Sequence, residues 1–362
     1  MYARFLKYVK RNRLFEGREK VLVALSGGAD STVLLHLLLR AVRQGALPLE
    51  LAVAHCHFQL RGAAADGDQA FAEALAKEAG LPFYTVRFDT AAYAKAQAVS
   101  IEMAARELRY GFFKRCMAQH GLQACALAHH ADDQAETVWL NLLRGTGLKG
   151  LRAMQAVQGV YVRPLLFARR AEIEAYAASQ GLAYCTDATN AEDDYLRNRI
   201  RHHLLPLCEQ LNPQAVAHAA QTALSLQRGE AVLSAWYAAA EARLVEREGP
   251  AAGALNASEV SEAARVAPSD AGSAPEPPAA PAAEFIAKTR LRRFQAEVGE
   301  AACLCFWEWY LKARDFNQEQ IEQIIQNYLG GEGGKVFEDR FGRRTLIRTP
   351  KGWRYTIPPA AP

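Results

Sequence analysis

The chain has 362 residues, which is enough for two domains with separate buried cores. Half of the residues are hydrophobic and 23% are charged, a composition typical of a soluble globular protein rather than a disordered one. The net charge of +4 is too small to indicate an anionic partner by itself.

Membrane insertion and secretion are not expected. No apolar stretch reaches the roughly 18 residues that indicate a transmembrane helix. The first 20 residues scatter Lys and Arg among apolar side chains and lack the compact apolar run of a signal peptide. The seven cysteines contain no CxxC pair, which favours reduced, mostly structural thiols. We therefore expect a cytoplasmic protein.

Short apolar runs alternate with amphipathic stretches in the first half of the chain, the pattern of a parallel sheet covered by helices. The predicted strands are Val21–Leu25, Leu49–Ala54, Phe83–Arg87 and Leu122–Ala128. The predicted helices are Thr32–Val42, Asp68–Ala79, Ile101–Gln119 and Asp133–Leu143. This order predicts an α/β domain over residues 1–207, with a doubly wound, Rossmann-like parallel sheet.

A mainly helical second domain is expected over residues 208–362, because the strand pattern stops after Pro206. Gln210–Glu248 is Ala-rich and predicts one long helix. The segment at about 249–283 is dominated by Ala, Pro, Gly and Ser, which predicts a flexible linker. A helix follows at Gln318–Tyr328. Alternating segments then predict a small C-terminal β-meander at Lys335–Phe337, Thr345–Arg348 and Trp353–Ile357.

The strongest motif is the segment SGGADST, which joins the first predicted strand to a helix. Glycines let backbone N–H groups approach a phosphate, and the positive end of the helix dipole stabilises its charge. The alternative is an ordinary strand-to-helix turn with a Ser or Asp cap. Asp30 accepts hydrogen bonds beside this anion site, which favours a bound cation or an orienting role. We expect the phosphate-binding residues to be Ser26, Gly27, Gly28, Ala29, Asp30 and Ser31.

Other polar residues follow the second and fourth predicted strands, at the edge of the sheet where open α/β folds bind ligands. After the second strand come His55, His57 and Arg61. After the fourth comes the segment His129–Asp133. Asp133 and Glu136 are three residues apart on one side of a helical turn, so their carboxylates can hold an ammonium group. The alternative is a helix-capping arrangement.

Two arginine-containing helices have less specific patterns. Glu102, Arg106, Arg109 and Tyr110 can share one helical face, which is typical of a solvated ion-pair ladder. Arg197 and Arg201 form part of a dense basic patch, which can bind a phosphodiester backbone or simply face solvent. The residues alone leave both questions open.

Seven motifs in fixed order carry a family resemblance. They are SGGADS, HCHFQLRG, EMAARELRY, AHHADDQAETVWLNLLRGTGLKGL, RPLL, DATN and YLRNRIR. Over about residues 20–207 they resemble the tRNA(Ile)-lysidine synthases, members of the N-type ATP pyrophosphatase (PP-loop) superfamily. The segment His55–Arg61 departs from the family pattern HxNHxLR, and the chain ends before the additional C-terminal domain of longer relatives.

The resemblance implies a ligase that uses ATP and magnesium to join free L-lysine to the wobble cytidine of an isoleucine tRNA with a CAU anticodon. The cytidine is first adenylated at O2, and lysine then displaces AMP. Magnesium would accompany ATP near Asp30, without a separate protein metal site. The implied catalytic residues are Asp30, Glu102, Asp133 and Glu136. The implied substrate-binding residues are His55, Arg61, Arg106, Arg109, His129, Asp133, Glu136, Arg197 and Arg201.

Two other functions remain possible for this sequence. A tRNA-thiolation enzyme of the same superfamily would use paired or cluster-binding cysteines, and the chain has no CxxC. A non-catalytic RNA-binding relative would not need the intact phosphate loop and the carboxylate pair. The sequence leaves open whether the chain forms a homodimer.

Overall fold

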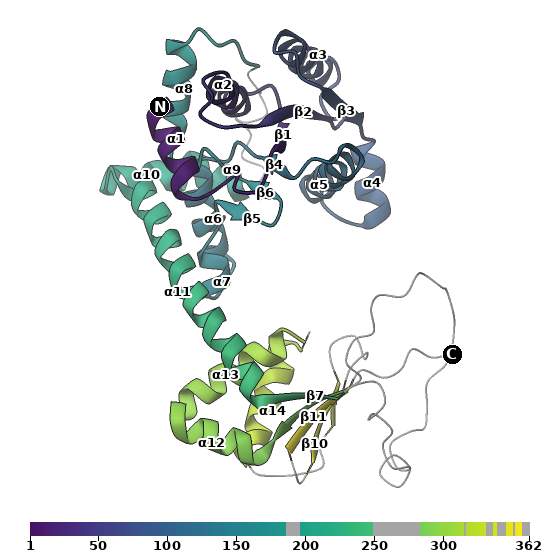
Figure 1. Ribbon diagram of the computed structural model, residues 1–362, viewed down its shortest axis with the longest axis vertical. Helices are drawn as coiled ribbons and strands as arrows, with labels where there is room; N and C mark the ends of the chain where they lie inside the picture. Colours follow the sequence, from purple (N-terminus) through teal and green to yellow (C-terminus); the bar gives the residue numbers. More distant parts are fainter. Residues whose placement is uncertain are drawn as a thin grey trace. The chain divides into compact units, whose positions relative to one another are not determined.

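The computed structural model describes residues 1–185, 196–248, 283–314, 316–330, 336–338, 345–349 and 352–356 (Figure 1). The chain divides into two compact units, Met1–Glu230 and Ala231–Pro362. The division falls inside helix α11 (Ala215–Leu244), whereas the sequence suggested domains of 1–207 and 208–362. That functional division stays a prediction.

The first unit contains a six-stranded sheet in the order β3-β2-β1-β4-β6-β5. Its strands are β1 (Lys20–Ala24), β2 (Glu50–His57), β3 (Phe83–Arg87), β4 (Ala124–Ala126), β5 (Val157–Gln158) and β6 (Tyr161–Val162). All neighbours pair in parallel except β5, which is antiparallel to β6. The chain leaves β1 towards β2 on one side and returns to β4 on the other. The predicted doubly wound α/β fold is confirmed.

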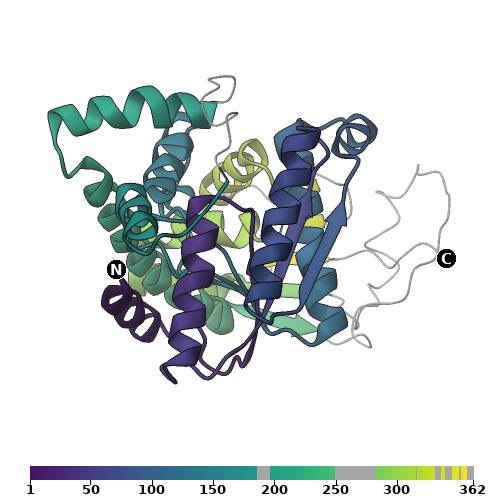
Figure 2. The same cartoon turned by 90° about the horizontal axis from the view of Figure 1, so that it is seen from above.

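Helices cover both faces of this sheet (Figure 1). One core packs against α1 (Tyr2–Arg11), α2 (Ala29–Arg43), α3 (Ala63–Glu78) and α8 (Arg170–Ser179). The other face is covered by α5 (Ile101–His120), which packs beside α4 (Thr90–Gln97). Viewed from above, α2 and α3 run side by side along the sheet (Figure 2).

The two cores follow from the alternation of side chains along β1. Val21 and Val23 are fully buried in the core on the α2 side. Leu22, between them, is fully buried in the core on the α5 side. A strand that is buried on both faces reads as a continuous apolar run, which is why this strand could be predicted. The sheet therefore fixes the position of the loop that follows β1.

The remaining helices of the first unit follow β4. They are α6 (Ala131–Leu143), α7 (Leu148–Leu151), α9 (Leu196–Arg199), a π-helical turn (Ile200–Leu204), α10 (Leu205–Leu211) and the first part of α11. A separate small core joins α6 to this region through Ala135, Ile200, Leu205 and Val216. The predicted DATN motif and Tyr195 lie outside the described residues. None of the described helices combines the length and apolarity needed to cross a bilayer.

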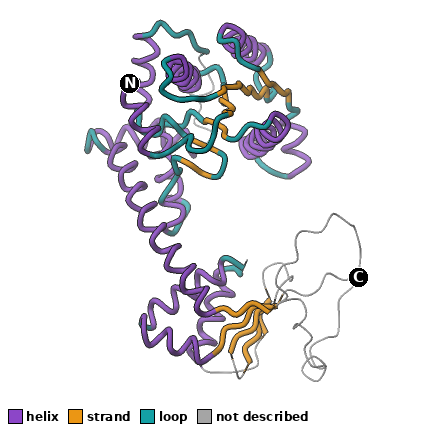
Figure 3. The backbone as a smooth tube through the Cα atoms, in the orientation of Figure 1, coloured by secondary structure: helices purple, strands orange, loops and turns teal. Residues whose placement is uncertain are grey.

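The second unit contains a five-stranded antiparallel sheet in the order β7-β8-β11-β10-β9. Its strands are β7 (Val245–Glu248), β8 (Ala283–Ala287), β9 (Val336–Glu338), β10 (Thr345–Thr349) and β11 (Gly352–Thr356). Its helices are the end of α11, α12 (Lys288–Val298), α13 (Glu300–Lys312) and α14 (Gln318–Gly330). Within this unit the strands form one layer beside the helices (Figure 3). Phe306, Trp307 and Tyr310 are fully buried in its core.

The predicted C-terminal β-meander is confirmed as β9, β10 and β11. The prediction of one long helix over Gln210–Glu248 is wrong at both ends. Gln210 belongs to α10, α11 runs from Ala215 to Leu244, and Val245–Glu248 pairs with β8. The partner strand is remote in sequence, so no local pattern revealed the pairing. The predicted linker at 249–283 falls outside the described residues, except that Ala283 begins β8.

Candidate active site

The phosphate loop connects β1 to α2 at the carboxyl edge of the sheet. Gly27 has a φ of +94°, a conformation that favours glycine, and Gly28 caps α2 with an extended backbone. The Ser26 and Ser31 hydroxyls lie 3.0 Å apart, and Ser31 Oγ donates to the Gly28 carbonyl at 3.0 Å. Both bonds tie the loop to Ser31 in the first turn of α2. The leading N–H groups of this helix have no partner within the helix. This geometry suits a phosphate group.

Two residues support the loop from behind. His55, at the end of β2, is buried, and its Nδ1 lies 2.9 Å from the Leu25 carbonyl oxygen. Burial lowers the pKa of His55, so the ring is neutral and donates to that carbonyl. The backbone N–H of Cys185 donates to the Gly27 carbonyl at 2.9 Å. His55 therefore shapes the loop and does not line the adjoining cavity.

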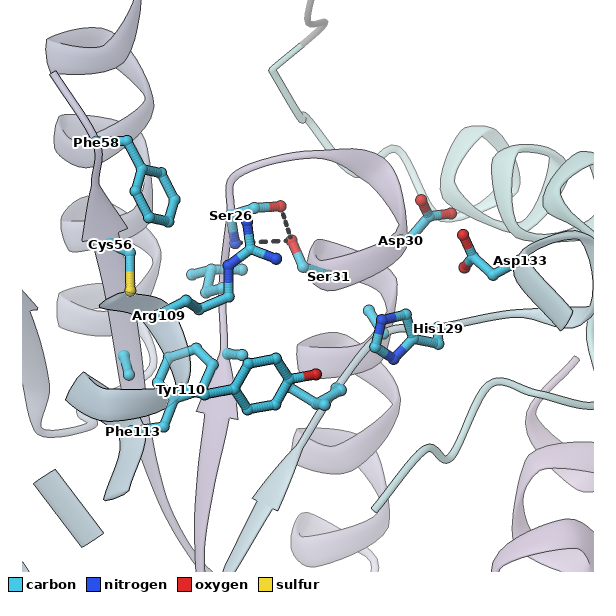
Figure 4. A pocket seen from close by; sticks show the side chains of 15 residues that line it. Ser26, Asp30, Ser31, Cys56, Phe58, Arg109, Tyr110, Phe113, His129 and Asp133 are labelled. Carbon is cyan, nitrogen blue, oxygen red and sulfur yellow. Dashed lines mark hydrogen bonds between the residues drawn. The ribbon is translucent and has the colours of Figure 1, made fainter. Parts of the chain in front are cut away.

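A cavity of about 350 Å³ opens beside the loop, between the ends of β1, β2 and β4 (Figure 4). This position is the topological switch point of the sheet. The strands β2 and β4 lie on opposite sides of β1, so the strand order reverses here. The polar and aromatic side chains that line it are Ser26, Asp30, Ser31, Cys56, Phe58, Arg109, Tyr110, Phe113, His129 and Asp133. The volume is within the range of small-molecule sites in proteins.

Asp30 brings a carboxylate with unused hydrogen-bonding capacity to this cavity. Its Oδ1 atom is buried and has no hydrogen-bond partner within the described parts of the chain. Burial, and the negative charge of Asp133 nearby, raise the pKa of Asp30, although His130 opposes the shift. A buried carboxylate oxygen without a hydrogen bond is unfavourable unless a ligand or cation compensates it. Asp30 therefore fits a role in binding a cation that accompanies phosphate.

The helix cap that was the alternative for Asp133 is also present. The backbone N–H of His130 donates to Asp133 Oδ2 at 2.9 Å, and the Asp133 N–H points back to His130 Nδ1. His130 Nε2 lies 3.4 Å from Asp133 Oδ2 and 3.7 Å from Asp30 Oδ2. Burial lowers the pKa of His130, but Asp132, Asp133 and Asp30 raise it more strongly, above its ordinary value. Asp133 therefore belongs both to the helix cap of α6 and to the lining of the cavity.

Arg197 and Arg201 bind the two carboxylates that the sequence assigned to an ammonium group. Arg197 donates from Nε to Glu136 at 2.7 Å and from Nη2 to Asp133 at 3.0 Å. Arg201, within the π-helical turn, donates from Nε to Glu136 at 2.5 Å. Glu136 is completely buried, so its charge is balanced by the arginines in this structure. Asp133 alone of the pair lines the cavity.

His129 faces the same cavity as a neutral ring. Its Nδ1 atom is buried without a hydrogen-bond partner among the described residues. Burial lowers the pKa of His129 to about 3, despite the charge of Asp133. A neutral imidazole can accept a hydrogen bond from a substrate without adding positive charge.

The structure does not bring every predicted site residue into the cavity. Glu102 is exposed in the first turn of α5, Arg106 stacks over Tyr110, and Arg61 pairs with Asp68 at 2.7 Å. Their proposed roles stay predictions. Arg109 does line the cavity, and its guanidinium lies 5.2 Å from the centre of the Phe58 ring.

Several residues of this region were not among the predicted site residues, although Asp132 belongs to the predicted polar segment His129–Asp133. Cys56 and Phe58 line the cavity, and their place at the carboxyl end of β2 was the available signal. Asp132 binds Arg169 at 2.9 Å and the Arg170 backbone N–H at 2.8 Å, which joins the start of α6 to the start of α8. Burial would raise the pKa of Asp132, but these hydrogen bonds and the one with His130 lower it well below its usual range. No local pattern predicted these contacts.

The phosphate loop, the switch-point cavity and the sheet order define an ATP-binding α/β domain. The PP-loop domain family matches residues 2–208, and the chain belongs to this family. A U34-tRNA thiolase from Methanococcus maripaludis has a similar fold, with a TM-score of 0.51 and 19% identity. That likeness covers 62% of this chain and 78% of the thiolase.

The chain is also similar to curated tRNA(Ile)-lysidine synthases. It is 45% identical to the one from Parabacteroides distasonis over 62% of this chain and 50% of that protein. It is 40% identical to the one from Bacteroides thetaiotaomicron over 68% of this chain and 56% of that protein. The chain spans about half the length of these curated relatives.

Proposed function

We propose that the protein is an ATP-dependent ligase that joins lysine to C2 of the wobble cytidine in an isoleucine tRNA with a CAU anticodon, in the cytoplasm. One arrangement carries the proposal: the phosphate loop and the carboxylates of Asp30 and Asp133 line a single cavity. The similarity to curated tRNA(Ile)-lysidine synthases supports the choice of substrate.

In the first step, O2 of the cytidine attacks the α-phosphate of ATP, and pyrophosphate leaves. The loop residues from Ser26 to Ser31 would hold the departing phosphates by backbone N–H groups and hydroxyls. Asp30 would hold magnesium beside them, and bound magnesium would neutralise the charge on the leaving group. The unpartnered Oδ1 of Asp30 supports that assignment. Arg109 would provide further positive charge from α5.

In the second step, the ε-amine of lysine attacks C2, the C2–O2 bond breaks, and AMP leaves with that oxygen. The amine attacks in its neutral form and loses a proton when the new C–N bond is complete. Asp133 faces the cavity and would accept this proton or orient the amine. The neutral His129 ring beside it would avoid repelling an incoming ammonium group.

Glu136 has a different role in this proposal from the one the sequence suggested. Because it is enclosed by Arg197 and Arg201, we assign it to positioning these arginines and, through them, Asp133. The arginines balance two carboxylates that would otherwise carry uncompensated charge.

A thiolation reaction is a weaker candidate. Burial raises the pKa of Cys56, which lines the cavity, to about 12, and that of Cys185 to about 11. Both are therefore protonated thiols at neutral pH, whereas sulfur transfer through cysteine needs a thiolate.

The test is a reaction of purified protein with ATP, magnesium, labelled lysine and unmodified CAU-anticodon isoleucine tRNA. We expect stable label in the tRNA and one AMP for each lysine joined. AMP release without lysine incorporation would contradict the lysidine assignment and direct the search to sulfur or ammonia donors. If neither product forms, the non-catalytic RNA-binding alternative gains support.

A further inference from the structure

The far end of helix α6 presents an exposed surface of leucines and cations. We define the α6–α7 surface as Leu142, Leu143, Arg144, Leu148 and Lys149. The three leucines are 49%, 58% and 48% exposed, and both cations are exposed. Large apolar side chains gathered on a surface mark an interaction site more often than scattered single ones do.

The charge of the surrounding sequence is one-sided. No Asp or Glu occurs from residue 137 to residue 171, whereas this stretch contains six Lys and Arg residues. Arg152, Arg169 and Arg170 each pair with a carboxylate from elsewhere. In the parts of the chain that the structure describes, Arg144 and Lys149 have no such partner. Their positive charge remains available to a ligand.

The surface is held in a defined shape despite its exposure. Asn141 Nδ2 donates to the Gly150 carbonyl at 2.8 Å, which closes the turn between α6 and α7. A Cβ atom on Gly150 would lie 1.9 Å from Thr146 Oγ1, so a larger residue would force the Thr146 side chain to move. Gln134 exchanges two hydrogen bonds with the Met154 backbone, at 2.8 and 3.0 Å. A ligand would therefore meet a preorganised surface.

We propose that the α6–α7 surface binds the single-stranded loop of the RNA substrate. Unpaired bases offer apolar faces to the leucines, while the phosphates of the same strand pair with Arg144 and Lys149. A second copy of this chain fits less well, because a two-fold contact would bring the same unpaired cations together. The identity of the RNA rests on the proposed lysidine function. Its single-stranded character rests on the exposed leucines and cations of the surface.

The position suits a substrate whose target base enters the cavity. Asp133 lies at the start of α6 and Leu143 at its end, ten residues or about 15 Å along the helix. A strand of a few nucleotides can span this separation. One RNA loop can thus contact the α6–α7 surface and place a base in the cavity.

The test measures binding of full-length protein to the CAU anticodon stem–loop RNA over a series of salt concentrations. We expect the double variant Arg144→Ala, Lys149→Ala to lower the affinity about tenfold or more and to reduce the salt slope by about 2. The matched control, Lys77→Ala with Lys95→Ala, removes two exposed cations from α3 and α4 and should bind like the wild type.

A second variant tests the apolar part of the surface. Leu142→Ser with Leu143→Ser should weaken binding of the stem–loop, leave its salt slope unchanged, and leave the weaker binding of a loop-free duplex unaffected. Equal affinity of the double arginine–lysine variant and the wild type would overturn the proposal. Loss of a dimer in sedimentation, with unchanged RNA binding, would also overturn it and assign the surface to a second copy of the chain.

Lysine incorporation measured on the same preparations separates the two claims. If the wild type incorporates lysine and the variants bind RNA as the wild type does, the proposed RNA-binding surface is refuted and the proposed function stands. Absence of incorporation in the wild type, with weakened binding in the variants, would refute the function and retain an RNA-binding surface.

Discussion

Buried charge is arranged differently in the two units. In the second unit, Arg314 donates to Glu284 at 2.8 Å and to Glu241 at 2.9 Å, and Tyr310 donates to Glu284 at 2.8 Å. The Arg314 guanidinium also lies 3.5 Å from the centre of the Tyr310 ring. This network is internally complete, as buried polar groups in a stable core generally are.

In the first unit, the polar groups at the cavity are incomplete. Asp30 Oδ1 and His129 Nδ1 are both buried without hydrogen-bond partners among the described residues. An unsatisfied buried group reduces stability, so a pair of ionisable side chains with such atoms in one cavity supports a ligand-binding role. The Arg314 network therefore fits a structural role in the second unit, whereas Asp30 and His129 retain hydrogen-bonding capacity for a ligand.

Removal of Arg314 should have the largest effect on stability. Arg314→Met would remove the cation that binds buried Glu284 and partly buried Glu241, and we expect a loss of about 3 kcal/mol in the free energy of unfolding. Urea titration of the full chain measures it. The control Glu308→Gln, which removes an exposed ion pair with Lys312, should cost less than about 1 kcal/mol. Equal effects of the two variants would contradict the structural role of the network.

Glu136 tests whether the first unit also contains a structural charge cluster. Glu136→Gln keeps the shape but leaves Arg197 and Arg201 with too little negative charge, so we expect a loss of about 3 kcal/mol in unfolding free energy. Glu16→Gln, at an exposed pair with Arg13, is the matched control. Normal stability combined with a raised KM for lysine alone would instead support direct contact between Glu136 and the substrate.

Asp133 tests the chemical role of the cavity in the first unit. We expect Asp133→Asn to slow the lysine-dependent step by about 100-fold or more, because a positioned proton acceptor is lost. Formation of the adenylated tRNA should be affected much less. Single-turnover measurements with and without lysine separate the two steps. An equal loss in both would count against the role assigned to Asp133.

Asp30 should show a trade between stability and activity. Because burial raises its pKa, the charged form disfavours the folded state at neutral pH, and Asp30→Asn should stabilise the ligand-free protein by about 1 kcal/mol. The same variant should lose adenylation. Thermal unfolding without nucleotide, compared with ATP-dependent chemistry, measures both effects. Destabilisation would show that Asp30 has a structural partner.

The smallest effect expected is a pH dependence from His130. Because its pKa is raised in the folded state, its contribution is complete below its unfolded pKa of about 6.5 and disappears as the pH rises through the folded value. His130→Asn retains a capping oxygen for α6 but does not titrate. The wild type should therefore lose more unfolding free energy than this variant between about pH 6 and pH 8, by less than about 1 kcal/mol. Parallel profiles would contradict the assignment.

Sequence patterns predicted those parts of the fold that depend on local order. The apolar run of β1 and the glycines at positions 27 and 28 predicted a strand, a turn and a phosphate loop. The repeated placement of polar residues after strands predicted that His129 and Asp133 would approach this loop, because parallel strands share one carboxyl edge.

Contacts between remote residues were not predictable in this way. The pairing of Glu136 with Arg201 joins residues 65 apart in the sequence, and the basic patch was equally consistent with RNA binding or a solvated face. Strands β7 and β8 become a pair only through tertiary structure. The neutral state of His129 depends on its burial, which no sequence spacing reveals.

The most direct test of the two-step account uses ATP labelled at the α-phosphate, with unmodified CAU-anticodon isoleucine tRNA and no lysine. The account predicts that label becomes attached to the tRNA at the wobble cytidine, and that added lysine releases it as AMP while lysine joins the tRNA. If the tRNA never acquires label, or the label remains after lysine is added, the proposed reaction is contradicted.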